Sequence, residues 1–350
     1  MRAIVMTRPG GPEALELVDR PDPRPGPGEV VVRVYAVAVN RLDIWVREDV
    51  GHAYAARLPV VPGYDVGGEV AAVGAGVTDV AAGETVYVHY DDSCGRCAFC
   101  LEGDEAACAG YEVMGVQRDG GYAELVVAPA RNIFALPDGL DARTAAAAGS
   151  VYLTAYHMLF ARAGLRPGET VLVTAGGSGV GGAAIALAGM AGARVVATAS
   201  TAAKRERLLA AGADHVIDYT AEGWSDEVRA LTGGRGVEVA VDHVGRSAFP
   251  GATAALANRG RIVLCGASSG SEAAIDLVDV FARQISIIGS SDGSRRELHE
   301  VFRLLAEGRV APPPITAELP LERAVDAQAL LASRDHYGRV LLIPGSDPER

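Results

Sequence analysis

The sequence predicts an α/β protein with two domains: a β-rich domain, and a doubly wound parallel sheet covered by helices. Its 350 residues are enough for two hydrophobic cores. Up to about residue 150, short β-type runs are separated by turns rich in proline and glycine. From residue 151, strand-like and helix-like runs alternate, which is typical of a parallel sheet. We expect domains at 1–150 and 151–287, with residues 288–350 returning to the first domain.

The individual elements follow from short apolar runs between turn-forming residues. In the first part the expected strands are 30–37, 68–73 and 85–88. In the second part they are 171–174, 194–198, 215–217, 237–241 and 261–264. A helix is expected after residue 174 and another over 202–211, and a helix and strand near the C-terminus include Leu331 and 340–343.

The composition indicates a soluble globular protein, because 49% of the residues are apolar and 22% are charged. The net charge of −12 argues against nucleic-acid binding and against an anionic membrane surface. Residues 170–193 carry no charge, but a cluster of glycines interrupts them, so we expect a strand, a turn and a helix there and no membrane span. The N-terminus lacks the apolar core of a signal peptide, which predicts a cytoplasmic protein.

Four of the five cysteines lie within fifteen residues, with the spacing C-x2-C-x2-C-x7-C. Four thiolates so arranged make a closed tetrahedral zinc site that leaves no position for substrate. We therefore predict one structural Zn²⁺ ion in a lobe over residues 91–110; two disulfides or unconnected thiols are the alternative. The predicted ligands are Cys94, Cys97, Cys100 and Cys108. Cys265 lies in an apolar run and is expected to be an inert buried thiol.

A glycine-rich turn follows the first strand of the alternating part. It reads Ala175-Gly176-Gly177-Ser178-Gly179-Val180-Gly181-Gly182. Such a turn before a helix lets the backbone approach a dinucleotide pyrophosphate at the helix N-terminus. The G-x-G-x-x-G pattern fits Gly177, Gly179 and Gly182; shifted by one residue it fits Gly176, Ser178 and Gly181, with the middle glycine replaced.

The end of the next strand indicates which dinucleotide is bound. An NAD site places a carboxylate there, but the run from Ala197 contains Ser200 followed by Lys204 and Arg205. Hydroxyl groups and cations suit a 2′-phosphate, which predicts NADPH. The alternative is that both cations are solvated charges at the start of a helix.

Together these motifs resemble the medium-chain dehydrogenase/reductase superfamily, over nearly the whole chain. The resemblance rests also on Asn40-Arg41-Leu42-Asp43, on 62–68, on 211–217 and on 337–340. It implies a GroES-like catalytic domain split around a Rossmann domain, with the active site between them. It also implies a homodimer, because 285–289 resembles the strand through which relatives pair.

Alcohol-oxidising members of this superfamily hold a second, catalytic zinc. Its three ligand positions correspond here to Asn40, Tyr64 and Ser150, and Leu42 replaces the residue that relays the alcohol proton. These side chains are poor zinc ligands, so the metal that would acidify an alcohol is expected to be absent. A replacement site is the alternative, drawn from Asp43, His52, Asp65, His89 and His157.

The same positions are similar to the zinc-independent quinone and enone reductases. That resemblance implies that Asn40 frames the nicotinamide and that Lys204 and Tyr219 bind the 2′-phosphate. We expect NADPH-dependent hydride transfer to a small-molecule quinone, enone or other conjugated carbonyl. Tyr64 or Tyr90 is the candidate proton donor, although each is equally a candidate for simple aromatic packing. The alternatives are an NADP-dependent alcohol dehydrogenase or carbonyl reductase with a non-standard site, and a non-catalytic NADPH-binding protein.

Overall fold

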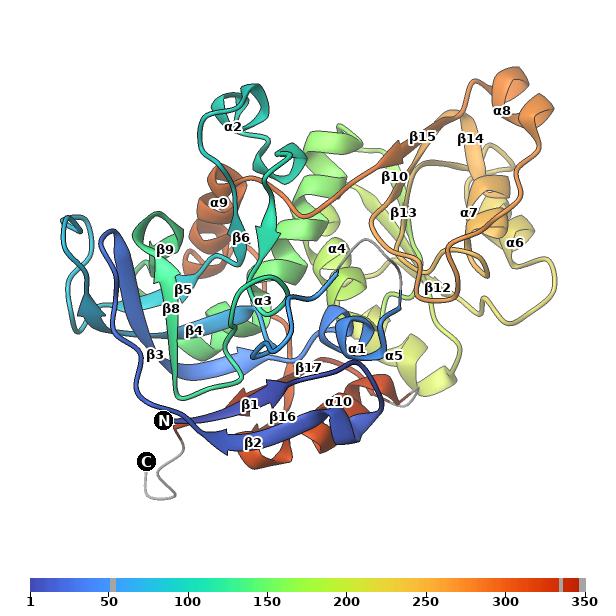
Figure 1. The fold of residues 1–350 in the computed structure, drawn as a ribbon. Coiled ribbons are helices and arrows are strands. Elements are labelled where there is room, and N and C mark those ends of the chain that lie inside the picture. The colour runs from blue at the N-terminus through green and yellow to red at the C-terminus, as the bar shows by residue number, and fades with distance from the viewer. Residues whose placement is uncertain (51–54, 334–335, 346–350) are drawn as a thin grey trace. The chain divides into compact units, whose positions relative to one another are not determined.

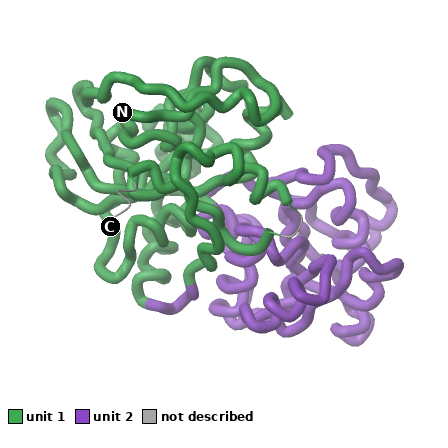
Figure 2. Tube along the Cα trace, turned by 90° about the horizontal axis from the view of Figure 1, so that it is seen from below, with its two compact units in different colours: residues 1–150, 294–307, 312–350 green, residues 151–293, 308–311 purple. Residues whose placement is uncertain are grey.

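The chain folds around two separate sheets, one in each of two units (Figures 1 and 2). The computed structural model describes residues 1–50, 55–333 and 336–345. Unit 1 comprises Met1–Ser150, Ser294–Glu307 and Pro312–Arg350, and unit 2 comprises Val151–Gly293 and Gly308–Ala311. The chain first passes from unit 1 to unit 2 inside helix α3 (Ala142–Tyr156).

Unit 1 is built on a seven-stranded sheet of order β16-β17-β3-β4-β5-β9, with β8 also paired to β3. Its strands are β3 (Glu29–Ala38), β4 (Asp65–Val73), β5 (Thr85–Val88), β8 (Leu125–Pro129), β9 (Ile133–Ala135), β16 (Ile315–Pro320) and β17 (Arg339–Ile343). Two small sheets pair β1 (Arg2–Met6) with β2 (Leu15–Asp19), and β6 (Asp91–Asp92) with β7 (Glu112–Val113). The helices are α1 (Arg41–Glu48), α2 (Ala98–Glu102), α3 (Ala142–Tyr156), α9 (Arg295–Ala306) and α10 (Ala324–Ala332).

Unit 2 is built on a six-stranded parallel sheet of order β12-β11-β10-β13-β14-β15. Its strands are β10 (Thr170–Val173), β11 (Arg194–Thr198), β12 (His215–Ile217), β13 (Val237–Asp242), β14 (Leu256–Leu264) and β15 (Ser286–Gly289). The helices are α4 (Gly179–Met190), α5 (Ala202–Ala210), α6 (Trp224–Leu231), α7 (Phe249–Ala254) and α8 (Leu277–Arg283), with a π-helical segment at His157–Arg162. The central strands are fully buried, as expected for a sheet covered on both faces.

Small residues allow α3 to pack closely on the sheet of unit 1. A Cβ atom on Gly67 of β4 would lie 1.9 Å from the Ala142 carbonyl oxygen at the start of α3. A Cβ atom on Gly149 would lie 2.4 Å from the Tyr87 hydroxyl. Any larger side chain would push the helix off the strands. The two glycines therefore bring the end of α3 within hydrogen-bond reach of β4 and β5.

The predicted α/β class is confirmed, with a β-rich sheet in unit 1 and a parallel sheet in unit 2. Unit 2 extends to Gly293, whereas the sequence placed the change at residue 287. The difference arises because β15 pairs with β14 and completes the parallel sheet. Within the described ranges, every helix is too short or too polar to span a lipid bilayer.

Candidate active site and metal-binding lobe

Three neighbouring strands of unit 1 bring three buried polar residues to one end of the sheet. Asp65 begins β4 and lies opposite Ala38 at the end of β3. Leu341 of β17 also lies opposite Ala38, on the other side of β3, so Arg339 at the start of β17 lies near Asn40. The strand registers therefore gather Asn40, Asp65 and Arg339 although up to 299 residues separate them.

Asp65 is the centre of a dense hydrogen-bond network. One carboxylate oxygen, Oδ1, accepts from the Tyr87 hydroxyl at 2.7 Å and from the Ser150 backbone N–H at 2.9 Å. The other, Oδ2, accepts from Asn40 Nδ2 at 2.8 Å, from Arg339 at 3.2 Å and from the Ser150 hydroxyl. The Asp65 and Arg339 side chains are 0% and 4% exposed. The guanidinium balances the buried carboxylate charge, and the other donors satisfy its remaining lone pairs.

This network engages two of the three positions that the family resemblance assigns to a catalytic metal. The Asn40 amide donates to Asp65 and accepts from Arg339 at 2.9 Å, and the Ser150 hydroxyl donates to Asp65. Neither an amide nor an alcohol is a usual zinc ligand, and the third position is a phenol, Tyr64. The Asn40 amide is buried and hydrogen bonded at both ends. Its predicted role beside the nicotinamide stays a prediction.

The two predicted tyrosines lie together. The rings of Tyr64 and Tyr90 pack edge to face with centroids 4.9 Å apart, and the His89 ring lies 5.2 Å from that of Tyr90. Tyr90 is buried, while Tyr64 is only partly buried. Burial and the nearby Arg295 guanidinium lower the pKa of His89 to about 3, so this imidazole is neutral. Tyr64 is therefore the more accessible of the two phenols.

Asp43 forms a second buried acidic site beside this network. Its Oδ2 atom accepts from the Asn40 backbone N–H at 2.8 Å and from the Tyr122 hydroxyl at 3.0 Å. Burial raises the pKa of Asp43 to about 7, against the lowering effect of these two donors. At the start of α1, Asp43 also caps the N-terminal turn of that helix.

The residues considered for a replacement metal site do not form one among the described residues. His52 lies outside the described residues. Asp43, Asp65, His89 and His157 belong to no group of three or more His, Cys, Asp or Glu side chains close enough to share an ion. Over residues 1–50, 55–333 and 336–345, the group that meets this criterion is the four cysteines.

The four predicted cysteines converge as a zinc site requires. Their sulfur atoms lie within 4.8 Å of one another, with Cys97 and Cys100 3.5 Å apart and Cys94 and Cys100 3.9 Å apart. Tetrahedral zinc with bonds of about 2.3 Å needs sulfur–sulfur separations of about 3.8 Å. All five cysteines are free thiols in the structure. The N–H groups of Arg96 and Cys97 lower the pKa of Cys94 to about 6, which favours its thiolate.

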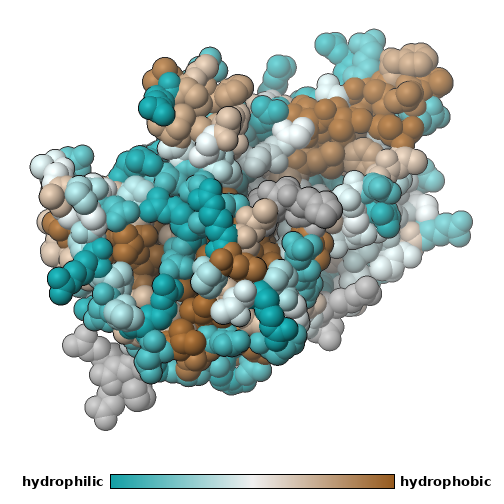
Figure 3. All heavy atoms as spheres, in the orientation of Figure 1, coloured by the Kyte–Doolittle hydropathy of each residue, from teal (hydrophilic) through white to brown (hydrophobic). Residues whose placement is uncertain are grey.

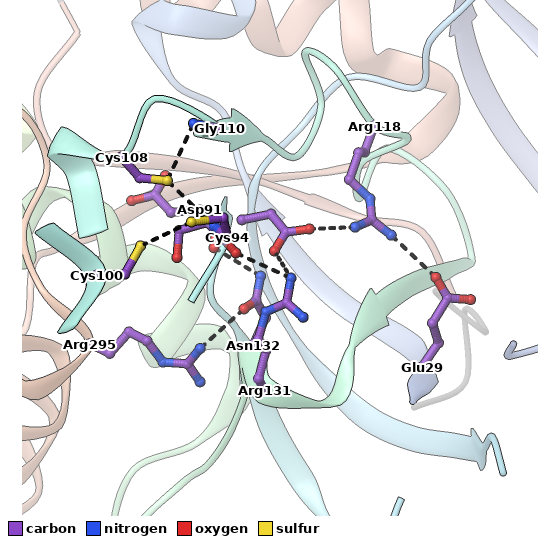
Figure 4. Close-up of polar contacts among 12 residues, drawn as sticks. Glu29, Asp91, Cys94, Cys100, Cys108, Gly110, Arg118, Arg131, Asn132 and Arg295 are labelled. Atoms are coloured by element: carbon purple, nitrogen blue, oxygen red, sulfur yellow. Dashed lines mark hydrogen bonds and ion pairs between the residues drawn. The ribbon is translucent and has the colours of Figure 1, made fainter. Parts of the chain in front are cut away.

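The base of the lobe is tied to the sheet by acidic side chains (Figure 4). Strands β6 and β7 pair across the base, and the Tyr111 hydroxyl donates to Asp91 at 2.5 Å. Asp92 accepts from Arg118 at 2.6 Å and also pairs with Arg131. These contacts hold the entry and exit of the lobe together.

The glycine-rich turn of unit 2 adopts the shifted alignment. A Cβ atom on Gly176 would lie 2.8 Å from Leu208 Cδ1, and one on Gly181 would lie 2.5 Å from the Ala175 carbonyl oxygen. A Cβ on Gly182 would meet no atom closer than 3.9 Å. These contacts favour Gly176 and Gly181 as the first and third glycines of the pattern, with Ser178 in the middle position. Gly177, Gly179 and Val180 complete the turn into α4.

The adenosine end of the predicted site contains one residue that the sequence reasoning missed. Ser200 follows β11, and Thr201 caps α5 by accepting from the Lys204 backbone N–H. Arg205 is paired at 2.7 Å with Asp218, which follows β12. Because β11 and β12 are parallel neighbours, their carboxyl ends lie side by side. The Asp218 carboxylate, which follows β12, therefore lies at the adenosine end and is the residue that the sequence did not predict. Tyr219 is next to it and is exposed.

Two further residues of these sites had no assigned role in the sequence. Arg339 is a lone cation at the start of an otherwise apolar run, and Tyr87 alternates with valines in β5. A buried cation beside apolar residues is a signal for a buried anion, but sequence does not identify the partner.

Comparisons with known proteins agree with the fold. The family described as alcohol dehydrogenase GroES-like domain matches residues 26–138, and the family described as zinc-binding dehydrogenase matches residues 179–307. Quinone oxidoreductase of Rattus norvegicus is 30% identical over 98% of each chain.

Two solved structures extend the comparison. The crystal structure of an NAD-dependent alcohol dehydrogenase is 46% identical over 99% of this chain and 100% of that one, with a TM-score of 0.94. A cobalt- and zinc-bound thermostable alcohol dehydrogenase from Pyrobaculum aerophilum is 35% identical over 98% and 99%, with a TM-score of 0.89. The chain therefore belongs to the medium-chain dehydrogenase/reductase superfamily of oxidoreductases.

Proposed function

We propose that this protein transfers hydride from NADPH to a quinone, an enone or another conjugated carbonyl compound, without a catalytic zinc. The observation that carries the proposal is the engagement of Asn40 and Ser150 with Asp65, together with a phenol at the third metal position. A conjugated acceptor needs less electrophilic help than a simple ketone, because its negative charge is delocalised onto the oxygen. A hydrogen-bond donor then suffices where an alcohol would need a metal ion.

The cofactor would supply the hydride, and the protein would orient it and provide a proton. Gly176, Ser178 and Gly181 provide close backbone approach to the pyrophosphate, and Lys204 is the proposed 2′-phosphate ligand. The Tyr64 hydroxyl is the proposed donor to the developing enolate, because Tyr64 is less buried than Tyr90.

Metal analysis combined with a substrate screen tests this proposal. We expect about one zinc per chain, and stopped-flow oxidation of NADPH by quinones and enones but not by simple aldehydes. About two zinc ions per chain with aldehyde reduction would instead support the alcohol dehydrogenase alternative, which the NAD-dependent relative favours. Binding of NADPH without oxidation by any acceptor would support a non-catalytic role.

Lys204→Ala is expected to raise KM for NADPH roughly tenfold or more, because a charge-assisted hydrogen bond to the 2′-phosphate is lost. KM for NADH should change little, since NADH lacks that phosphate. Asp218→Asn should act in the opposite direction, because the carboxylate paired with Arg205 would repel a phosphate. Equal loss of NADPH and NADH affinity in Lys204→Ala would contradict the proposed specificity.

We propose that the four-cysteine lobe holds a structural zinc. Cys100→Ser is expected to reduce bound zinc from about one per chain to nearly none, as measured by atomic emission, because a closed site needs all four thiolates. Cys265→Ser is the matched control, since it lies outside the lobe and desolvation raises the pKa of that thiol to about 12. Cys265 is only partly buried, and not fully buried as the sequence predicted. Retention of zinc by the Cys100 variant would exclude this ligand set.

A homodimer through β15 is also proposed. This strand is an edge of the parallel sheet, and apolar residues gather over it and α8 (Figure 3). Ile287→Lys is expected to convert a dimer into a monomer in light scattering, because the charge would lie in the pairing surface. Leu17→Lys is the control, as Leu17 and Ile287 are 44% and 43% exposed. A wild-type monomer, or an unchanged Ile287 variant, would rule this interface out.

A further inference from the structure

Ser178 and His243 meet at the point where the strand order of unit 2 reverses. Strands β10 and β13 are parallel neighbours, with Val173 opposite Val241, so their carboxyl ends lie at the same edge. Strand β11 lies on the other side of β10. Ligands of open α/β sheets bind at such a reversal. The Ser178 hydroxyl oxygen and His243 Nε2 are 2.7 Å apart at this place.

The turn that carries His243 is held firmly. The buried Asp242 carboxylate accepts from the Thr174 hydroxyl at 2.8 Å, and from the backbone N–H groups of Val244 at 3.0 Å and Gly245 at 3.2 Å. These bonds join the end of β10 to the residues after β13. The backbone on both sides of His243 is therefore held at the end of β10, where the glycine-rich turn begins.

The hydrogen-bonding groups of Ser178 and His243 leave the Ser178 hydroxyl hydrogen without an acceptor within the pair. Burial lowers the pKa of His243, against the raising effects of the Asp242 charge and of a hydrogen bond from the ring to the Ala175 backbone, so the ring is neutral and carries a single N–H. The Ser178 oxygen already accepts from the Gly181 N–H at 3.0 Å, and His243 Nδ1 is buried with no hydrogen-bond partner among the described residues. A proton on Nδ1 would be a buried unpaired donor, which is costly. A proton on Nε2 avoids this cost and leaves the Ser178 hydroxyl hydrogen to point elsewhere.

We propose that His243 is a positioning residue of the dinucleotide site: its Nε2–H donates to Ser178, which turns the Ser178 hydroxyl hydrogen toward a pyrophosphate oxygen of the cofactor. The inference rests on dinucleotide binding at this turn, as in the proposed function. This role explains why Ser178 occupies the middle position of the pattern, where glycine usually lets the backbone approach the pyrophosphate. With its hydrogen directed outward, the hydroxyl attracts phosphate; with a lone pair outward, it would repel phosphate.

The test is a double-mutant cycle with calorimetric binding of NADP⁺ to the zinc-loaded full chain. His243→Leu is expected to weaken NADP⁺ binding roughly tenfold, the effect of one hydrogen bond to a charged group. In the Ser178→Gly background the same change should have no effect, since there is no hydroxyl to orient. His243→Gln should restore binding, because its amide can donate in place of Nε2. Circular dichroism of each variant checks folding.

Two further measurements separate this role from a merely structural one. Adenosine 2′-phosphate lacks the pyrophosphate, so its affinity should be the same in all variants. The imidazole ¹⁵N shifts of His243 should show the Nε2–H tautomer. An equal loss for NADP⁺ in both backgrounds, a loss for adenosine 2′-phosphate, no loss at all, or an Nδ1–H tautomer would each overturn the proposal.

The outcome is distinguishable from failure of the proposed function. If the wild type binds NADP⁺ but oxidises NADPH with no quinone or enone, the proposed function fails while the cycle still decides the role of His243. If only NAD⁺ binds, the cycle is run with NAD⁺, which has the same pyrophosphate, and with adenosine, which has no phosphate and is expected to be insensitive to His243. If neither dinucleotide binds, both proposals are overturned.

Discussion

Tyr64→Phe is expected to lower kcat for an enone roughly a hundredfold, with little change in KM for NADPH. Loss of a positioned proton donor typically costs 10²- to 10⁴-fold in rate, and the lower figure is expected because water can replace a partly exposed phenol. Stopped-flow measurement of NADPH oxidation at saturating enone gives the chemical step directly.

Tyr90→Phe is the matched control for this prediction. The two rings pack against each other at 4.9 Å, so either substitution keeps the aromatic contact and removes one hydroxyl. Tyr90 is buried, and we expect its hydroxyl to matter little for catalysis. A large loss in Tyr90→Phe together with an active Tyr64→Phe would reverse the assignment, and two fully active variants would exclude both phenols as donors.

Arg339→Met is expected to destabilise the fold by about 3–5 kcal/mol, because it leaves the Asp65 carboxylate buried without its counter-charge. The arginine also accounts for the orientation of the Asn40 amide, whose oxygen accepts from it at 2.9 Å. The loss is measured as a lower urea midpoint in equilibrium unfolding monitored by circular dichroism.

Arg303→Met is the control for the charge change. Arg303 pairs with Glu300 and Glu307 on the exposed face of α9, where solvent screens both charges, so the urea midpoint should barely move. The double variant Arg339→Met, Asp65→Asn should recover part of the loss, because the unpaired charge is then removed. A midpoint unchanged in Arg339→Met would show that the buried pair contributes nothing to stability.

Contacts between residues close in sequence could be predicted before the structure was known. The four cysteines span fifteen residues, so their spacing alone brings four sulfur atoms to one point. The buried strands of the parallel sheet follow in the same way from unbroken apolar runs such as Val171–Val173.

The glycine-rich turn is an intermediate case. Its position between a strand and a helix follows from composition, yet two alignments of the pattern were open. The choice depended on Ala175, which contacts Gly181 within the turn, and on Leu208, which contacts Gly176 only when α5 packs on the sheet.

By itself, the sequence determined the two-sheet fold, the cysteine group and the loss of metal-binding residue types at Asn40, Tyr64 and Ser150. Only the tertiary structure decided what those residues do instead: Asn40 and Ser150 bind Asp65, which Arg339 balances from the far end of the chain. Local patterns record which residues can form a strand, a turn or a ligand group. The partners of a buried charge depend on strand register and helix packing, which join distant segments and leave no periodic signal in the chain.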